Sequence, residues 1–287
     1  MGIRAGGDVK KTGKGGFLPS TLAGGDTFAS GVAVTALALL AGFISLPILS
    51  LLLWTVNENS WRAMATPEAR DALLLSIRTT SISMLIIISV GTPAAYVLAR
   101  KNFHGKRLLD SLIDIPAVLP PSAAGIALLL TFGRFGLAGK YLEAFGVQVT
   151  FTTAAVVIAE VFVAAHFYVR QATVGFSQVR RDVEEAARVD GAGSIGVFTK
   201  VTVPLALPAL VAGAVMAWAR ALGEFGATIV FAGSFQGVTQ TIPLAIFAEF
   251  QSNLDAAVAL SVLVLGFAFT VILAVRFLTA RMTADEY

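Results

Sequence analysis

Six long apolar stretches constrain the fold of this 287-residue chain more than any other feature. A helix needs about 20 mostly apolar residues to cross a hydrocarbon core about 30 Å thick, and each stretch reaches that length. None shows the alternation of membrane strands, and a spanning segment must satisfy its backbone internally. With 56% hydrophobic and 14% charged residues, the chain is predicted to be an all-α membrane protein. The predicted transmembrane helices are residues 32–55, 73–98, 112–132, 152–174, 206–226 and 256–279.

The distribution of Lys and Arg predicts that the N- and C-termini are both cytoplasmic. With the N-terminus inside, fourteen basic residues fall in cytoplasmic segments and four in outer loops, leaving out Arg78, Arg170 and Arg220 in or near the helices. Cytoplasmic loops of membrane proteins carry such an excess. Because the basic residues are spread among loops rather than clustered on one face, the net charge of +3 does not indicate nucleic-acid binding.

Residues 1–29 are Gly-rich and polar, and we expect a flexible cytoplasmic tail before a six-span domain at residues 30–287. The tail lacks the apolar core of a cleaved signal peptide. Gly13-Lys14 does not form a phosphate-binding loop, since the first Gly of that motif is missing and Gly15 stands at its Ser/Thr position. With no Cys and two His, metal sites are not expected. The sequence predicts no enzyme and no cofactor bound by this chain.

The most specific pattern lies in a predicted cytoplasmic loop, residues 175–205. Glu185-Ala186-Ala187 is followed after three residues by Gly191, and Pro204 ends the pattern. We expect Pro204 to lie in the first turn of the fifth span. Proline has no backbone N–H, and the N–H groups of a helix's first turn have no partner within the helix.

Local signals predict two short helices in this loop. Ser177 or Asp182 would cap the first helix, which would run through Val189. Asp190-Gly191 would end it in a left-handed conformation, and Ser194 would cap the second helix.

One face of the first predicted helix is suited to contact with another protein. Val183, Ala186 and Ala187 share this face, and small side chains let a partner approach the backbone closely. Glu184 lies elsewhere on the helix. The alternative is an amphipathic helix that lies on the membrane surface, but it does not explain the spacing of Gly191 and Pro204.

The Glu-Ala-Ala pattern resembles the EAA loop of ABC-transporter permeases, which docks onto the ATPase subunit. The resemblance covers about residues 70 to 280, and three of its segments look like permeases for tetrahedral oxyanions: residues 106–110, 114–121 and 220–228. Residues 231–233 and 239–246 most resemble the molybdate/tungstate branch, with sulfate or thiosulfate as the nearest alternative cargo.

The chain departs from this family at three positions. Val201 and Val203 replace the usual Ile and Leu, which should be neutral for packing. Glu160 places an acid in the fourth span, where a neutral residue is expected, so an anion path beside that helix is in doubt.

The resemblance implies an ATP-driven importer in the cell membrane of a prokaryote. Such an importer contains a second copy of this chain, two cytoplasmic ATPase subunits that use ATP and Mg, and an external solute-binding protein. The loop with Glu185, Ala186, Ala187, Gly191 and Pro204 would couple ATPase motion to alternating access. Physically, a short helix joined rigidly to two spans could transmit such a motion as a rigid body.

Four residues are candidates for the translocation pathway. Pro120-Pro121 would break the third span and free carbonyl groups, which a membrane tolerates where protein or a water-filled cavity satisfies them. Arg220 and Glu224 form an i,i+4 pair in the outer half of the fifth span, where they could lie at a gate. The alternatives are a kink that serves packing and a self-satisfied structural pair.

Three ionisable residues populate the fourth span. His166 and Arg170 share a face; we expect His166 to be a hydrogen-bonded packing residue and Arg170 to extend toward the inner interface. Glu160 has no assigned role. A different class of function, a proton-coupled membrane carrier, would use Glu160 and His166 as titrating groups. A third reading is a membrane anchor without transport, which predicts no cavity between Pro120 and Arg220.

Residues 227–254 are predicted to be a long outer loop, since they contain no Lys or Arg and two Gly. By analogy the loop would face the binding protein; a passive lid is the alternative.

Overall fold

The computed structural model describes residues 22–55 and 64–284, and these residues form helices and connecting turns without a β-strand. The prediction of an all-α protein is confirmed. The chain divides into two compact units, Met1–Ser50 and Leu51–Tyr287. The long helices are α1 (Leu22–Trp54), α3 (Pro67–Arg100), α7 (Thr153–Gln178), α10 (Val203–Leu222) and α13 (Leu254–Ala284).

These helices match the predicted spans in position but differ at their ends. Five helices of the described residues are long and apolar enough to cross a membrane, or six if one bent pair counts as a span. Helix α1 begins at Leu22, so the described end of the predicted tail is helical. Residues 1–21, with Gly13-Lys14, lie outside the described residues.

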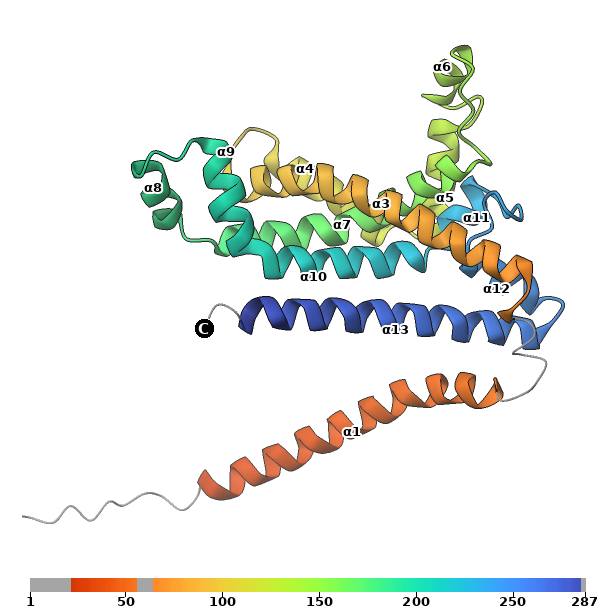
Figure 1. Ribbon diagram of the computed structural model, residues 1–287, viewed down its shortest axis with the longest axis horizontal. Helices are drawn as coiled ribbons and strands as arrows, with labels where there is room; N and C mark the ends of the chain where they lie inside the picture. The colour runs from red at the N-terminus through yellow and green to blue at the C-terminus, as the bar shows by residue number, and fades with distance from the viewer. Residues whose placement is uncertain (1–21, 56–63, 285–287) are drawn as a thin grey trace, which may run out of the picture. The chain divides into compact units, whose positions relative to one another are not determined.

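Three helices of the second unit, α3, α7 and α10, run side by side (Figure 1). Small residues permit this close approach. A Cβ on Gly175 of α7 would lie 2.5 Å from the Cβ of Ala209 on α10, and one on Gly91 of α3 would lie 2.9 Å from the Tyr168 ring on α7. Without a hydrophobic driving force between helices in lipid, such contacts hold spans together by van der Waals packing.

The predicted third span is broken into two helices, α4 (Lys106–Val118) and α5 (Pro121–Phe132), which are bent by 118°. Leu119 and Pro120 have extended backbone between them. A residue before proline is disfavoured in helical conformation, and proline cannot donate the next helical hydrogen bond. The predicted break at Pro120-Pro121 is therefore confirmed, and the second half of the span leaves the direction of the first.

The prediction that residues 227–254 form a loop without helices is wrong, because the segment contains two helices, α11 (Gly226–Phe231) and α12 (Ile242–Phe250). Helix α11 packs against α5, where a Cβ on Gly125 would lie 2.8 Å from the Ala227 carbonyl oxygen. Helix α12 is fixed at its start, since the Ser76 hydroxyl of α3 accepts a 2.8 Å hydrogen bond from the Ile242 N–H. Both helices are too short to span a membrane, so they carry no hydropathy signal of a span.

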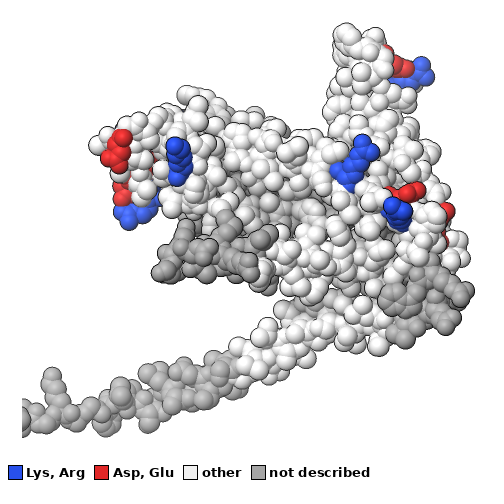
Figure 2. Space-filling model, viewed as in Figure 1, with Lys and Arg blue, Asp and Glu red and all other residues white. Residues whose placement is uncertain are grey.

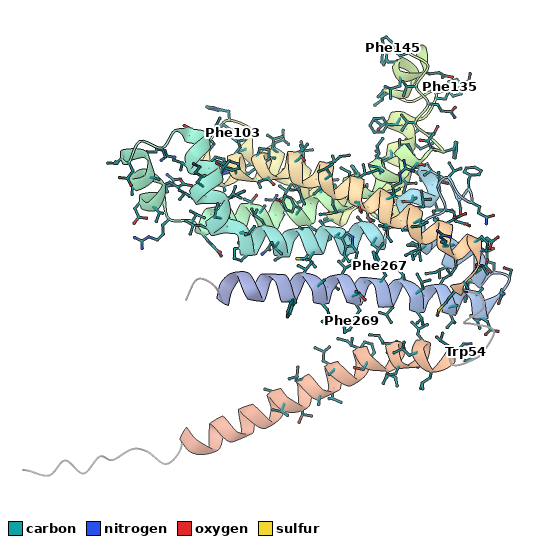
Figure 3. The ribbon with its side chains drawn as sticks, in the orientation of Figure 1. Trp54, Phe103, Phe135, Phe145, Phe267 and Phe269 are labelled. Atoms are coloured by element: carbon teal, nitrogen blue, oxygen red, sulfur yellow. The ribbon has the colours of Figure 1, made fainter. Side chains whose placement is uncertain are left out.

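Between α5 and α7 the chain makes a projecting hairpin with one short helix, α6 (Gly139–Ala144). Figure 3 shows Phe135 and Phe145 on this projection, and their exposed fractions are 91% and 85%. Arg134 and Glu143 pair across the hairpin at 2.7 Å.

We predict that Gly175→Ala destabilises the helix bundle, because its added methyl group would overlap Ala209. Overpacking of this kind costs about 1–3 kcal/mol of unfolding free energy. The matched control is Gly266→Ala on α13, where no atom lies within 4 Å of the added Cβ. Denaturation in detergent should show a lower midpoint for Gly175→Ala alone; equal midpoints would contradict the close packing of α7 on α10.

Candidate functional site

The loop with the Glu-Ala-Ala pattern folds into three consecutive helical pieces at one end of the second unit, opposite α12 (Figure 1). They are α8 (Arg181–Val189), α9 (Ser194–Val197) and the π-helical turn η1 (Phe198–Thr202), which continues into α10. Helix α8 ends where predicted, and Gly191 adopts a φ of +90°, so the left-handed stop is confirmed.

The predicted helix caps are wrong. Ser177 lies in the last turn of α7 and donates a 2.8 Å hydrogen bond to the Thr173 carbonyl. Asp182 lies inside α8 and binds the Arg180 guanidinium, whose hydrogen bond holds the pKa of the Asp182 carboxyl below its ordinary value. Helix α9 has Gly193 at its cap position, and Ser194 is its first residue.

Most of the predicted coupling residues lie on the surface. Glu185, Ala186 and Gly191 are exposed, and Ala187 is partly exposed. Figure 2 shows charged side chains at this end of the visible face, with a broad uncharged surface beyond them. The exposed part of α8 is therefore available to another protein.

The neighbouring residue, Glu184, is the one buried residue of α8, with 4% of it exposed. Its Oε1 accepts hydrogen bonds from Thr202 Oγ1 at 2.7 Å and from Arg100 Nη2 at 3.0 Å. Sequence reasoning assigned Glu184 no role. The helical period alone places it beside the small-residue face, and nothing in the sequence indicates Arg100, which is 84 residues away.

Pro204 lies in the first turn of α10, directly after the π-helical turn. Its position in that turn agrees with the prediction, but the helical path already begins at Ser194 and passes through η1. In η1 the Val203 N–H donates to the Phe198 carbonyl, five residues back. Single π-turns occur often at functional sites, and here the turn holds Thr202, which is fully buried, against Glu184.

Three of the four pathway candidates meet where α10, α11 and α5 converge. Arg220 Nη1 lies 2.6 Å from Glu224 Oε2, so the predicted i,i+4 pair is present as an ion pair, although it lacks the alignment of a hydrogen bond. Glu224 Oε1 also accepts a 2.6 Å hydrogen bond from the Ala227 N–H. Pro121 packs on α11, since a Cβ on Gly226 would lie 2.5 Å from the Pro121 Cβ.

The fourth candidate, Pro120, is exposed at the break itself. Glu224 is 2% exposed, whereas 27% of the Arg220 side chain is exposed. The pair therefore presents its cation, and not its carboxylate, to the surroundings.

Arg170 has partners that the sequence did not predict, two acids of α4: its Nε lies 2.6 Å from Asp114 Oδ1 and its Nη1 lies 3.1 Å from Asp110 Oδ1. His166 Nδ1 lies 3.2 Å from the Ile113 carbonyl oxygen, as expected for a hydrogen-bonded packing residue. These bonds tie α7 to α4, which has no buried residue of its own.

Glu160 ties α7 to α3 on another side of the helix. It is 2% exposed, and its two carboxyl oxygens accept hydrogen bonds from Thr79 at 2.8 Å and from Ser83 at 2.7 Å. The structure thus gives Glu160 the structural role that the sequence left open. Glu160 and His166 contact different helices and do not form a relay.

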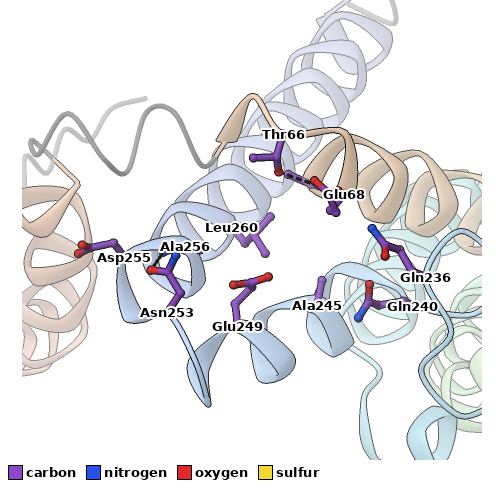
Figure 4. Close-up of a pocket in the computed structure, with 11 residues that line it drawn as sticks. Thr66, Glu68, Gln236, Gln240, Ala245, Glu249, Asn253, Asp255, Ala256 and Leu260 are labelled. Carbon is purple, nitrogen blue, oxygen red and sulfur yellow. Dashed lines mark hydrogen bonds between the residues drawn. The ribbon is translucent and has the colours of Figure 1, made fainter.

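A cavity of about 580 Å³ lies where α3, α12 and α13 meet (Figure 4), and neither Arg220 nor Glu224 lines it. Glu68, Glu249 and Asp255 line it together with Gln236 and Gln240. Three carboxylates disfavour an anion, so this cavity is not an oxyanion site. Within the described residues, no group of His, Asp and Glu is arranged to hold a metal ion.

The sequence family described as "Binding-protein-dependent transport system inner membrane component" matches residues 87–284. The chain belongs to this family. It is a multi-pass inner-membrane permease subunit of an ABC transporter, and a transport component rather than an enzyme.

Related permeases cover most of the chain. The molybdenum transport system permease protein ModB of Mycobacterium tuberculosis is 44% identical over 81% of this chain and 88% of the relative. ModB of Escherichia coli K12 is 40% identical over 63% of this chain and 80% of the relative. A probable sulfate transport permease, cysT of Helicosporidium, is 31% identical over 84% of this chain and 91% of its own length.

Solved structures show the same fold at low sequence identity. A bacterial ABC transporter that imports the polysaccharide alginate matches with a TM-score of 0.72 and 13% identity, over 90% of this permease and 96% of the matched chain. A methionine ABC transporter matches with a TM-score of 0.54 and 20% identity, over 75% of this permease and 94% of the matched chain.

We predict that Arg170→Gln loosens α4 from α7. The broken contact is intermediate between a surface ion pair and a buried one, so the loss should be about 1–3 kcal/mol of unfolding free energy. Arg134→Gln is the matched control, because its pair with Glu143 is largely exposed and its loss should cost less than about 1 kcal/mol. Denaturation in detergent measures both; an equal loss would contradict the anchoring role of Arg170.

Proposed function

We propose that this permease is the membrane subunit of an importer for tetrahedral oxyanions, with molybdate or tungstate as cargo. The cargo assignment rests on one observation: this permease is 44% identical to a molybdenum permease, over 88% of that relative's length. Sulfate or thiosulfate is the second candidate, supported by the 31% identity to a probable sulfate permease. The difference between these identities favours molybdate.

The proposed topology has six spans with both termini in the cytoplasm. Helices α4 and α5 together count as the third span, and the excess of basic residues in the inner segments supports the orientation. The tail is then residues 1–29, the membrane domain residues 30–287 and the coupling loop residues 175–205. In this orientation α8 faces the cytoplasm and α12 faces outward.

The proposed assembly contains two copies of this permease, two cytoplasmic ATPases and an external solute-binding protein. The family description names a binding-protein-dependent system, which supports the external component. ATP and Mg act in the ATPases, since the permease sequence has no phosphate-binding loop.

Coupling is proposed to run through the exposed face of α8. Glu185, Ala186 and Ala187 would contact the ATPase, Gly191 would set the end of the docking helix, and Pro204 would fix the start of α10. Energy reaches the transport path as a rigid-body displacement, one of the established forms of switching motion.

The proposed pathway passes the junction of α5, α10 and α11. Here the broken helix at Pro120 and Pro121 supplies non-helical backbone, and Arg220 supplies a partly exposed cation. Glu224 neutralises part of that charge, which would keep a dianion from binding too tightly to leave. Such a balance is required of any transport path.

The proton-coupled carrier is the less favoured class. It needs Glu160 and His166 to exchange protons, yet Glu160 is enclosed by Thr79 and Ser83 while His166 faces α4. The membrane-anchor reading leaves the family membership unexplained.

The proposed function predicts ATP-dependent uptake of labelled molybdate into vesicles that hold the permease with its ATPase and its binding protein. Excess sulfate should not compete. Competition by sulfate would change the cargo assignment, whereas uptake without ATP that follows pH would contradict the importer and favour the carrier.

We predict that Gly191→Pro uncouples ATP hydrolysis from transport. Gly191 has a φ of +90°, which proline cannot adopt because its ring fixes φ near −65°. Uptake per ATP should fall about tenfold while the spans stay folded. Gly193→Pro is the matched control, since Gly193 already has a φ of −66°. Coupled uptake by Gly191→Pro would show that the turn does not position α8.

A further inference from the structure

Helix α8 has little buried surface of its own. Of its residues, Glu184 alone is buried, while Val183, Glu185 and Arg188 on the neighbouring positions are exposed. The face proposed to meet the ATPase thus has little apolar packing behind it. A force on α8 can pass through its two ends and through the hydrogen bonds of the Glu184 carboxylate.

The Glu184 carboxylate joins α8 to two other segments. Thr202 belongs to the π-helical turn that leads into α10, and Arg100 is the last residue of α3. Arg100 Nη2 donates to Glu184 at 3.0 Å and also to the Val179 carbonyl, just before α8, at 2.8 Å. Helix α8, its entry segment, α3 and the start of α10 therefore meet at one place.

The charges at this place depend on one another. The Arg100 side chain is 9% exposed, and its Nε is buried without a hydrogen-bond partner. A buried guanidinium that loses its counter-ion is strongly unfavourable, because the remaining charge is left without compensation. Without the Glu184 charge, we expect Arg100 to turn away and to release α3 from α8.

We propose that Glu184 is the positioning residue that makes α8 move as one body with α3 and α10. The inference rests on the proposed role of α8 in ATPase coupling. Peptide connectivity alone would pass motion from α8 to its chain neighbours, α7 and α10, and the bond to Arg100 adds α3. Because α3 packs on α7 through Gly91 and Tyr168, all three central helices would then follow α8.

A distance measurement in the complete transporter tests this proposal. The natural chain has no Cys, so Val97→Cys on α3 and Val189→Cys on α8 can carry two spin labels at exposed positions. Labelled chains are diluted with unlabelled ones, and the distance is compared without nucleotide and with ATP plus vanadate. The proposal predicts no change in the chain with Glu184 intact. With Glu184→Gln, which keeps an acceptor for Thr202 but removes the charge that holds Arg100, the distance should change on adding nucleotide.

A second measurement separates a role in coupling from a purely structural one. Uptake per ATP hydrolysed should fall about tenfold in Glu184→Gln, while the rate of ATP hydrolysis and the thermal midpoint stay close to those of the natural chain. Asp182→Asn is the matched control, because it makes the same carboxylate-to-amide change at an exposed position of α8. It should behave like the natural chain in both measurements.

Thr202→Val provides an independent variant if Glu184→Gln does not fold. It removes one hydrogen bond, keeps the ion pair, and should uncouple in the same direction by a smaller factor. Unchanged distance and coupling in whichever of the two variants folds would overturn the proposal. The distance does not depend on the cargo, so failure of molybdate uptake by the natural chain would refute the proposed cargo and leave this test intact.

Discussion

The need to satisfy every backbone hydrogen bond inside a membrane governs this structure. In the central helices α3, α7 and α10 the helical ladder meets that need, and small residues bring the ladders together. Within the membrane, irregular backbone is then tolerated only where other groups satisfy its N–H and C=O groups. In the part of the chain that the structure describes, the break before Pro121 lies within a predicted span, whereas the π-helical turn ending at Thr202 and the left-handed Gly191 lie in the loop at residues 175–205.

These departures coincide with the residues to which we assign function. The break lets α5 leave the span and pack on α11, close to the Arg220 and Glu224 pair. The π-turn brings Thr202 to Glu184. The π-turn has a polar partner on another segment, Glu184, whereas the break is held by close packing of Pro121 on α11.

The sequence predicted what depends on local chemistry and missed what depends on distant partners. Hydropathy located the spans, Pro120-Pro121 located the break and Gly191 located the end of α8, because each signal lies in adjacent residues. The sequence does not reveal the contact of Arg170 with Asp114, which is 56 residues away, or the contact of Glu184 with Arg100, which is 84 residues away. Hydropathy does not reveal α11 and α12 in residues 227–254, because both helices are shorter than a span.

The central claim is that the exposed face of α8 meets the ATPase. Site-specific cross-linking tests it most directly, since the absence of natural Cys lets Ala186→Cys carry a single short cross-linker. We predict a cross-link from this position to the ATPase subunit in the assembled transporter, and none from Phe145→Cys on the projecting hairpin. A cross-link from Phe145→Cys but not from Ala186→Cys would contradict both the coupling role of α8 and the proposed orientation.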